Sequence, residues 1–450
     1  MYRLISLRIW MGFLLCCLSA NLLADTLKLN LSQAVGLAVS QNKVLAAEQA
    51  GLDAAGAGII QAQAHFWPTV TASSGLLRTD SALNVFGFKL LQQRVATADF
   101  DPALLNNPVS INNVQTRIDV QASVYQGGAM QAAEMRAKKL FQATKMSLAA
   151  RKQKLLFDVI AAYTRVFQNK AQVSAAQKAY EAAQKHLKTT QLLQRKGVVI
   201  NSDVMDTNVH RLNAQIALTQ AHNAYRRALD ELRRLLSIDA DTELDLAQPP
   251  SLEKSPADIT LLADWASKNR PDIVAMLHQK QASKAAINER EAAFKPQVDV
   301  QLTQEWNSEN FDLENQNKTL AAKLSWNLFA GGGDKAALRA ARAQTLKIQY
   351  QIDDKRYEIR NAVINQARLL NEAIQRQHVK QQAQQQSAEA LRIRSLRHEQ
   401  GLEKTSDLLA SQAQFDASRA EAIRATYDVT IARAALLLAA GKLTQEDIKS

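Results

Sequence analysis

The feature that most constrains the fold of this chain is an internal repeat with an offset of 204 residues. Two glycine motifs each occur twice at this spacing: Gly127-Gly128 with Gly331-Gly332, and Gly197 before Asn201-Ser202-Asp203 with Gly401 before Thr405-Ser406-Asp407. Copies of this kind are structural units that pack against one another. The sequence therefore predicts two structural repeats, residues 25–248 and 259–450, joined by a linker at 249–258.

Each repeat contains two runs in which apolar and polar residues alternate, the pattern of a strand with two unlike faces. The runs cover residues 69–74, 117–124, 298–303 and 319–328, and aromatic residues cluster at their ends. Runs of about 9–11 residues suit tilted membrane-spanning strands. Any single run could also be a half-buried strand of a soluble sheet. As barrel strands, they would turn Leu324 and Trp326 toward lipid, and Lys323 and Ser325 toward a lumen.

The connection between the first two runs, residues 77–113, shows no sustained period and is predicted to be a long loop. Pro68 and Pro296 precede strand runs, and glycine pairs follow other runs. We expect these residues to be hinges between strands and helices: Gly127, Gly128, Gly331, Gly332, Pro68 and Pro296.

Two very long helices are predicted after the glycine pairs, at residues 130–196 and 334–400. Neither segment contains proline or glycine, and each has 67 residues, about 100 Å of helix. Apolar residues recur every three or four positions, as in a coiled-coil seam: Leu156, Ile160, Tyr163 and Phe167, then Ile359, Val363, Ala367, Leu370 and Ile374. With the helices that return after Gly197 and Gly401, they predict antiparallel hairpins at 130–237 and 334–441.

Helix-start signals are predicted at three serines. Ser32 is the expected N-cap of a helix covering residues 29–66, and Ser202 and Ser406 are the expected caps of the returning helices. Asp203 and Asp407 follow at the end of the helix dipole that favours negative charge. Residues 259–294 are again helical, with an interruption at Pro271.

The N-terminus predicts a secretory signal peptide at residues 1–24. Arg3 and Arg8 flank the start of a short apolar run, and Ala24 provides a small residue for cleavage. The run is too short for a membrane anchor. Lipid attachment at Cys16 or Cys17 is a second possibility, although large residues precede both. A mature chain without cysteine suits an exported protein that has no disulfides.

Composition and motifs disfavour other classes of protein. Only 15 Gly and 8 Pro in 450 residues, with 6% aromatics, favour long helices over compact domains. The net charge of +12 lies on helical sequence without interleaved aromatics, so we predict no nucleic-acid partner. The seven histidines are scattered, and the triple glycine at 331–333 lacks the Lys-Ser/Thr of a phosphate-binding loop. We predict no enzyme activity, cofactor or metal.

Four strands cannot close a barrel, and open strand edges are not tolerated in lipid. Three chains would supply twelve strands. The predicted fold class is therefore mainly α with a membrane β-barrel: a long antiparallel coiled-coil tunnel, four strands per chain, and a twelve-stranded barrel formed by a homotrimer.

Over nearly the whole mature length, the chain resembles the TolC-type outer-membrane efflux proteins. The resemblance rests on the duplicated helix-strand-strand-helix order and on two motifs, Asn269-Arg270-Pro271-Asp272-Ile273 and Gly401 with Ser406-Asp407-Leu408-Leu409. It implies a trimeric channel-tunnel in outer-membrane lipid that extends into the periplasm. It also implies docking on a periplasmic adaptor and an inner-membrane pump or secretion ATPase. A periplasmic adaptor is the alternative, but it would have one hairpin instead of two.

The resemblance also implies a narrow periplasmic aperture with acidic rings. Asp407 falls on a family acidic position, whereas Ala410 stands where some members carry a second acid. The candidate aperture residues are Asp407, Asp203, Asp206 and Glu403, and the candidate tip and adaptor contacts are Gly197, Gly401, Ser202 and Ser406. Glu403 and Lys404, with Arg394 and Arg397 nearby, could form the ties between helices that keep such an aperture shut. Helix N-terminal charge is the alternative role of Asp203 and Asp407.

Overall fold

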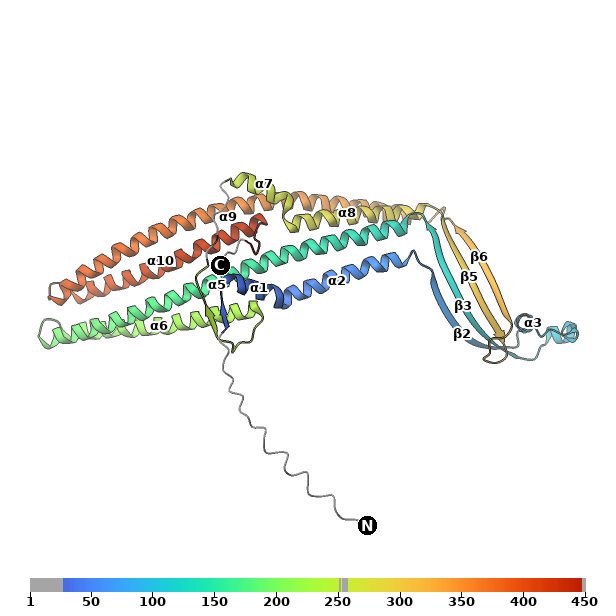
Figure 1. Ribbon diagram of the computed structural model, residues 1–450, viewed down its shortest axis with the longest axis horizontal. Coiled ribbons are helices and arrows are strands. Elements are labelled where there is room, and N and C mark those ends of the chain that lie inside the picture. The colour runs from blue at the N-terminus through green and yellow to red at the C-terminus, as the bar shows by residue number, and fades with distance from the viewer. Residues whose placement is uncertain (1–26, 251, 253–257, 447–450) are drawn as a thin grey trace, which may run out of the picture. The chain divides into compact units, whose positions relative to one another are not determined.

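The computed structural model describes residues 27–250, 252 and 258–446 (Figure 1). The predicted signal peptide, with Cys16 and Cys17, lies outside the described residues, as does most of the predicted linker. The chain forms two compact units. The strand unit comprises Ala47–Ala150 and Ser267–Arg360, and the tip unit comprises Met1–Ala46, Arg151–Ala266 and Asn361–Ser450. Each unit therefore takes segments from both sequence repeats.

The strand unit is built on one antiparallel sheet, in which all four predicted strands are present (Figure 1). The strands are β2 (Thr69–Thr79), β3 (Ile111–Gln126), β5 (Gln297–Ser308) and β6 (Gln316–Ser325). They lie in the order β2-β3-β5-β6, so β2 and β6 form the two edges. Helices α2 (Lys43–Ala64) and α8 (Pro271–Glu291), the latter followed by the 3₁₀ turn η2 (Ala292–Phe294), lead toward β2 and β5.

Two details of the predicted strands are wrong. Strand β6 ends at Ser325, so Trp326 lies beyond it, where its Nε1 donates a hydrogen bond to the carbonyl of Phe294 at 3.1 Å. In β3 the register shifts between Ser123 and Tyr125, and Tyr125 pairs with Val298. A β-bulge inserts one residue and leaves it unpaired. Tyr125 therefore continues the apolar row that was predicted to include Val124.

The connection predicted as an irregular loop, residues 77–113, contains regular structure. Strand β2 continues to Thr79, and three short elements follow: α3 (Ala82–Leu91), the 3₁₀ turn η1 (Thr97–Phe100) and α4 (Pro102–Asn106). An ion pair of 2.5 Å between Lys89 and Asp99 links two of these elements. Elements of four to ten residues are too short to show a helical period, so no periodic pattern predicts them.

The predicted helical hairpins are present, with ends within one residue of the expected ones. The first is α5 (Ala129–Arg195) with α6 (Asn201–Leu236), and the second is α9 (Gly333–Glu399) with α10 (Thr405–Ala440). The predicted seam residues are buried or half-buried except Ile374, which is 40% exposed. Ala373 is buried instead, because the seam steps by three residues from Leu370 at this point.

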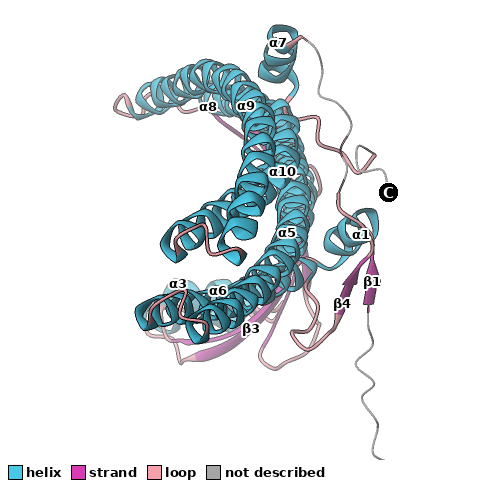
Figure 2. Ribbon diagram, turned by 90° about the vertical axis from the view of Figure 1, so that its left-hand side faces the viewer, coloured by secondary structure: helices cyan, strands magenta, loops and turns pink. Residues whose placement is uncertain are grey.

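The tip unit also contains a small cluster of shorter elements, with β1 (Leu27–Leu29) paired in parallel with β4 (Leu244–Leu246) next to α1 (Leu31–Gln41) (Figure 2). Helix α7 (Ile259–Asn269) belongs to the same unit as far as Ala266. Tyr163 on α5 is fully buried, and its hydroxyl lies 3.2 Å from the carbonyl of Leu29 and 3.1 Å from that of Gln248. These contacts hold the cluster against the first hairpin.

The helix predicted over residues 29–66 is divided into α1 and α2 at Asn42. The Asn42 side chain donates to the carbonyl of Leu235 at 2.9 Å and accepts from the amide of Val44. The N-cap of α1 is Asn30, whose Oδ1 accepts from the amide of Gln33 at 2.8 Å. The predicted cap, Ser32, lies inside the first turn. Asparagine competes well for both tasks because its side chain both donates and accepts.

Candidate functional site

Each hairpin turns at a glycine with left-handed backbone geometry. The φ angles are 74° at Gly197 and 73° at Gly401, a conformation that disfavours residues with a Cβ. A Cβ at Gly401 would lie 3.1 Å from Cγ1 of Val198 in the other hairpin, whereas one at Gly197 would meet nothing within 4 Å. The two hairpin tips of one chain therefore touch at Gly401.

The predicted serine caps are wrong. The N-cap residues are Ile200 for α6 and Lys404 for α10, so Ser202 and Ser406 lie within the first helical turns. At the first tip, Asp203 supplies the capping acceptor: its Oδ2 accepts a hydrogen bond from the Ile200 amide at 3.1 Å. Valine and isoleucine before α6 cannot cap, so the carboxylate three residues into the helix takes this role.

The second tip is held by two arginine side chains, Arg394 and Arg397. Arg397 Nε lies 2.8 Å from Oε2 of Glu403, and Arg397 Nη2 donates to the carbonyl of Leu402 at 3.3 Å. Arg394 Nη1 donates to the carbonyl of Asp407 at 3.1 Å. All three contacts join the end of α9 to the turn or to the start of α10. They therefore stabilise the second hairpin itself.

The structure brings only some of the predicted aperture residues together. Asp203 and Glu403 both line an open pocket between the two tips, whose other walls include Leu193, Ile200 and His398. Asp206 and Asp407 do not line this pocket, and Asp206 is exposed on α6. Asp407 is half-exposed in the first turn of α10. Within one chain, two of the four acids therefore line the same pocket, and the other two lie outside it.

A half-buried polar network lies where the two hairpins pack together, and it was not predicted from the sequence. Nε2 of His186 on α5 lies 3.2 Å from Oε1 of Gln412 on α10, and Gln412 Nε2 donates to Oδ2 of Asp416 at 3.0 Å. His210 on α6 lies close enough to Asp416 for the two charges to interact. Burial lowers the pKa of both histidines and raises the pKa of Asp416. The available sequence signal for this network was the presence of His186 and His210 among the seam residues of their helices.

The predicted hinge residues lie between strands and helices. All four glycines have positive φ: 64° and 93° at Gly127 and Gly128, and 59° and 86° at Gly331 and Gly332. A Cβ at Gly127 would come within 2.7 Å of the carbonyl oxygen of Ala292, so only glycine fits there. Pro68 and Pro296 stand immediately before β2 and β5.

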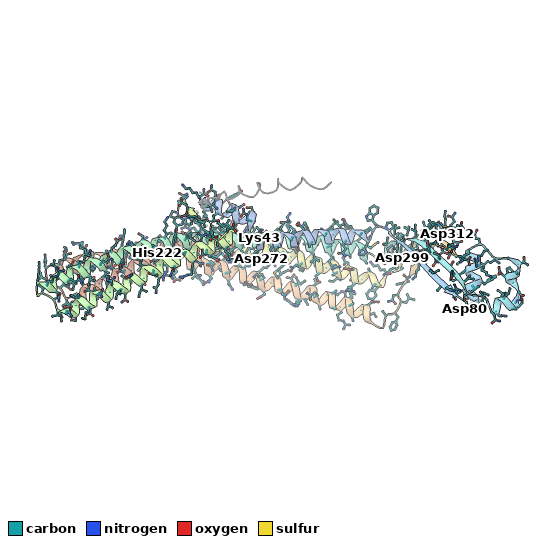
Figure 3. All side chains as sticks on the ribbon, turned by 90° about the horizontal axis from the view of Figure 1, so that it is seen from below. Lys43, Asp80, His222, Asp272, Asp299 and Asp312 are labelled. Carbon is teal, nitrogen blue, oxygen red and sulfur yellow. The ribbon has the colours of Figure 1, made fainter. Side chains whose placement is uncertain are left out.

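One face of the four-stranded sheet is polar and internally hydrogen-bonded. Asp119 accepts from the Thr303 hydroxyl at 2.6 Å and from Gln301 at 2.9 Å, and it pairs with Arg117 at 2.8 Å. Further along the face, the Ser123 hydroxyl donates to Asp299 at 2.7 Å. Figure 3 places Asp299 at one end of the sheet, with Asp80 and Asp312 at the other.

The opposite face of the sheet is apolar and exposed in the single chain. One row runs across all four strands: Val70, Val120, Leu302 and Leu320 are paired in register. Leu324 is 70% exposed, and Leu320 is 75% exposed. A large apolar surface on a folded chain marks contact with a membrane or a partner. The predicted division between Leu324 and Lys323 agrees with these two faces.

The described part of the chain has neither a membrane-spanning helix nor a group of metal ligands. No helix there combines the length and apolar character required to cross a membrane. Among those same residues, no group of three or more His, Cys, Asp or Glu side chains is placed to hold a metal ion.

A sheet with unlike faces, joined through glycine hinges to long helical hairpins, defines a class of outer-membrane channels. The Campylobacter jejuni CmeC outer membrane channel has this fold: the two structures match with a TM-score of 0.80, at 14% identity, over 92% of this chain and 86% of that one. The class predicted from sequence, mainly helical with four strands per chain, is confirmed.

The chain belongs to the outer membrane efflux protein family, whose model matches residues 34–237 and 262–442. The alkaline protease secretion protein AprF of Pseudomonas aeruginosa is 25% identical over 311 residues, 66% of this chain and 63% of its own length. The match therefore spans less than two thirds of AprF. Protein CyaE of Bordetella pertussis is 26% identical over 440 residues, 93% of this chain and 85% of CyaE.

Family and fold together answer the question that the sequence left open between channel and adaptor. The chain is an outer-membrane channel-tunnel protein, located in the outer membrane and extending into the periplasm. The adaptor alternative is dropped. The family and the fold are those of channels and not of known enzymes.

Proposed function

We propose that three copies of this chain form the passive exit duct of a type I secretion or efflux system. The partners would be a periplasmic adaptor and an inner-membrane pump or secretion ATPase. The name of AprF, a relative that serves protease secretion, favours an exported protein as cargo. In such a system the pump selects the cargo, and the duct supplies a continuous polar path.

The observation that carries the trimer is the four-stranded sheet with two unpaired edges, β2 and β6. Backbone groups left unpaired in lipid cost several kcal/mol each, which limits membrane-spanning sheets to closed barrels. Pairing β6 of one copy with β2 of the next closes twelve strands in three copies. The hydrogen-bonded face with Asp119 and Asp299 would then line the lumen, and the face with Leu320 and Leu324 would meet lipid.

The test is the mass and conductance of the protein in detergent and in planar bilayers. We expect light scattering to give about three times the chain mass of 49.7 kDa, less any cleaved signal peptide, and single channels to conduct. A folded, monodisperse monomer would overturn the barrel argument.

Two neighbouring substitutions test which face of β6 meets lipid. Leu324 lies one residue from the end of β6, so Leu324→Arg should cost less than the roughly 2–4 kcal/mol of a midplane position, but more than its neighbour, because the arginine would enter lipid. Ser325→Arg should insert normally, because the side chain would enter the lumen. If only the serine variant fails to assemble, as judged by trimer yield in the outer-membrane fraction, the assigned faces are reversed.

We further propose that Asp407, Asp203 and Asp206 converge at the periplasmic end in the trimer, near the tip contacts Gly197, Gly401, Ser202 and Ser406. Three copies of each carboxylate would attract cations to a narrow axis although the chain as a whole is basic. The triple Asn variant should lose cation preference in single-channel recordings while remaining trimeric. Unchanged selectivity would reduce these residues to helix-start charges, the role supported for Asp203 by its bond to Ile200.

A further inference from the structure

The half-buried network between the two hairpins contains titratable side chains of both hairpins. We call the four residues the hairpin network: His186 on α5, His210 on α6, and Gln412 and Asp416 on α10. Gln412 is 2% exposed and bonds to both hairpins, to His186 at 3.2 Å and to Asp416 at 3.0 Å. None of these side chains has a part in the channel function derived above.

The hydrogen bonds determine where the proton of His186 resides. The Gln412 amide nitrogen donates to the Asp416 carboxylate, so its oxygen faces His186. An amide oxygen can only accept, so Nε2 of His186 must carry the hydrogen. His186 is therefore held as the neutral Nε2–H tautomer, with Nδ1 available for a second proton. In the same network, Nε2 of His210 is buried without a hydrogen-bond partner.

The charges around the two histidines differ. The charged or titratable groups that act on His186 are all basic: His210, His398 and Lys185. His210 instead faces the carboxylate of Asp416, which is also near Arg419. A proton on His210 would be offset by Asp416, whereas a second proton on His186 would add an unpaired positive charge at a half-buried contact.

His398 on α9, the remaining basic group, is a different case. It is buried, with Nε2 3.3 Å from the Thr405 hydroxyl, and the charges that act on it are acidic: Asp203, Glu399 and Glu403. These acids do not offset burial, which still lowers the pKa of His398. His186 differs in that the charges acting on it are all basic, so both burial and charge oppose its protonation.

The network occurs once in each chain, although the chain is a duplication. The positions 204 residues from its members hold side chains that cannot rebuild it: Ala390 for His186, Gln414 for His210, Asn208 for Gln412 and Leu212 for Asp416. A trimer would therefore contain three such networks, one at each contact between the two hairpins of the same chain.

We propose that His186 is a pH sensor that releases the contact between the two hairpins on acidification and so favours opening of the periplasmic end. The inference rests on the proposed duct, because release matters only where the hairpins enclose a passage. The Nε2–H bond to Gln412 is available in both protonation states and by itself favours the charged ring, but burial and the neighbouring positive charges outweigh it. The doubly protonated side chain favours the separated hairpins, where water can solvate the charge.

The direction follows from linkage. Burial depresses the pKa of His186, so separated hairpins bind the proton more readily than packed ones. The contact is strongest above the ordinary histidine pKa of about 6.5 and weakens as the pH falls through that value toward the lowered one. Asp416 acts in the opposite sense at lower pH, because its raised pKa favours the packed state once it is protonated.

The experiment uses the full trimer in planar bilayers, with the pH on the periplasmic side lowered from 7.5 to 5.5. The wild type should open more often at low pH, by about tenfold for each unit by which burial depresses the pKa of His186. His186→Gln keeps a donor for Gln412 but cannot titrate, so its opening should respond less to pH than that of the wild type, with His210 and His398 supplying what remains. His222→Gln, which changes an exposed histidine of α6, should respond as the wild type does (Figure 3).

Hydrogen exchange of α10 residues 405–416, measured on the same trimers, reports the hairpin contact independently of conductance. Exchange should accelerate on acidification more in the wild type than in His186→Gln, after correction for intrinsic rates. An equal acid response in the two proteins, by either measurement, would overturn the sensor. A trimer that never conducts would count against the duct alone, since exchange would still decide the role of His186.

Asp416→Asn tests the separate roles assigned to His186 and His210. It removes the carboxylate that compensates His210, so the variant should open at higher pH than the wild type. A weaker acid response in this variant would overturn the division of roles between the two histidines.

Discussion

The two hairpin tips share one backbone and differ in nearly every contact that holds them. Both have helices of 67 and 36 residues and a glycine with φ near 74°. At equivalent positions the first tip has Thr190, Leu193, Val199 and Ile200, and the second has Arg394, Arg397, Glu403 and Lys404. The comparison shows that duplication preserved the turn geometry, while the side chains that stabilise each turn diverged.

The first tip is stabilised by burial and the second by charged hydrogen bonds. Leu193 is 8% exposed, and the buried hydroxyls of Thr190 and Thr207 lie 3.5 Å apart. At the second tip, Glu403 is 14% exposed but its partner Arg397 is 56% exposed. Apolar burial is insensitive to salt, whereas an ion pair open to water is weak and screened. The two tips should therefore respond differently to substitution and to ionic strength.

The largest difference is expected at the equivalent pair Leu193 and Arg397. Leu193→Ala removes a buried side chain and should cost about 2–5 kcal/mol. Arg397→Ala removes a largely exposed ion pair and should cost about 1 kcal/mol or less. Local opening free energies from hydrogen exchange at each tip would measure both. If Arg397→Ala is the more damaging, the division between a buried and a charged tip is wrong.

The turn glycines should differ by a smaller amount. Alanine at either position adopts a left-handed conformation at a cost of roughly 1–2 kcal/mol. Gly401→Ala should cost more than Gly197→Ala, because its Cβ would press on Val198 at 3.1 Å. Exchange at the altered turn is the measurement, and Gly401→Ala combined with Val198→Ala is the control. Equal costs for the two single variants would contradict the contact between the tips.

The two N-terminal aspartates should differ by about 1 kcal/mol. Asp203→Ala removes both a favourable helix-dipole charge and the acceptor for the Ile200 amide, whereas Asp407→Ala removes the charge alone. Hydrogen exchange at the first turns of α6 and α10 would measure how much each helix frays and would distinguish the two variants. Similar fraying at both helices would show that the bond to Ile200 adds nothing.

Ionic strength should produce the smallest effect and should act only on the second tip. Glu403→Gln should destabilise that tip by less than about 1 kcal/mol at 0.1 M salt, where the Debye length is ~10 Å. The difference from the wild type should vanish at 1 M salt. The equivalent variant of the first tip, Val199→Ala, should show no salt dependence, and a salt effect there would refute the comparison.

Long periodic segments were predictable from sequence, and short or side-chain-determined features were not. Helices α5 and α9 were predicted to within one residue because 67 positions without glycine or proline repeat one period. The helices in residues 77–113 were missed because they are too short to show a period. Ser32, Ser202 and Ser406 were wrongly chosen as caps because several residues compete for the same amides. Asn30 and Asp203 provide the observed acceptors.

The sequence by itself determined the duplication, the hairpins and the two faces of the strands, since each follows from a local period of 3.6 or 2 residues along the chain. Only the tertiary structure decided which polar groups meet across the hairpins. His186 and Gln412 are 226 residues apart, and no local pattern specifies their contact. Packing brings them to 3.2 Å and buries Gln412. The chemistry of such a pair therefore depends on the folded chain and cannot be read from either residue alone.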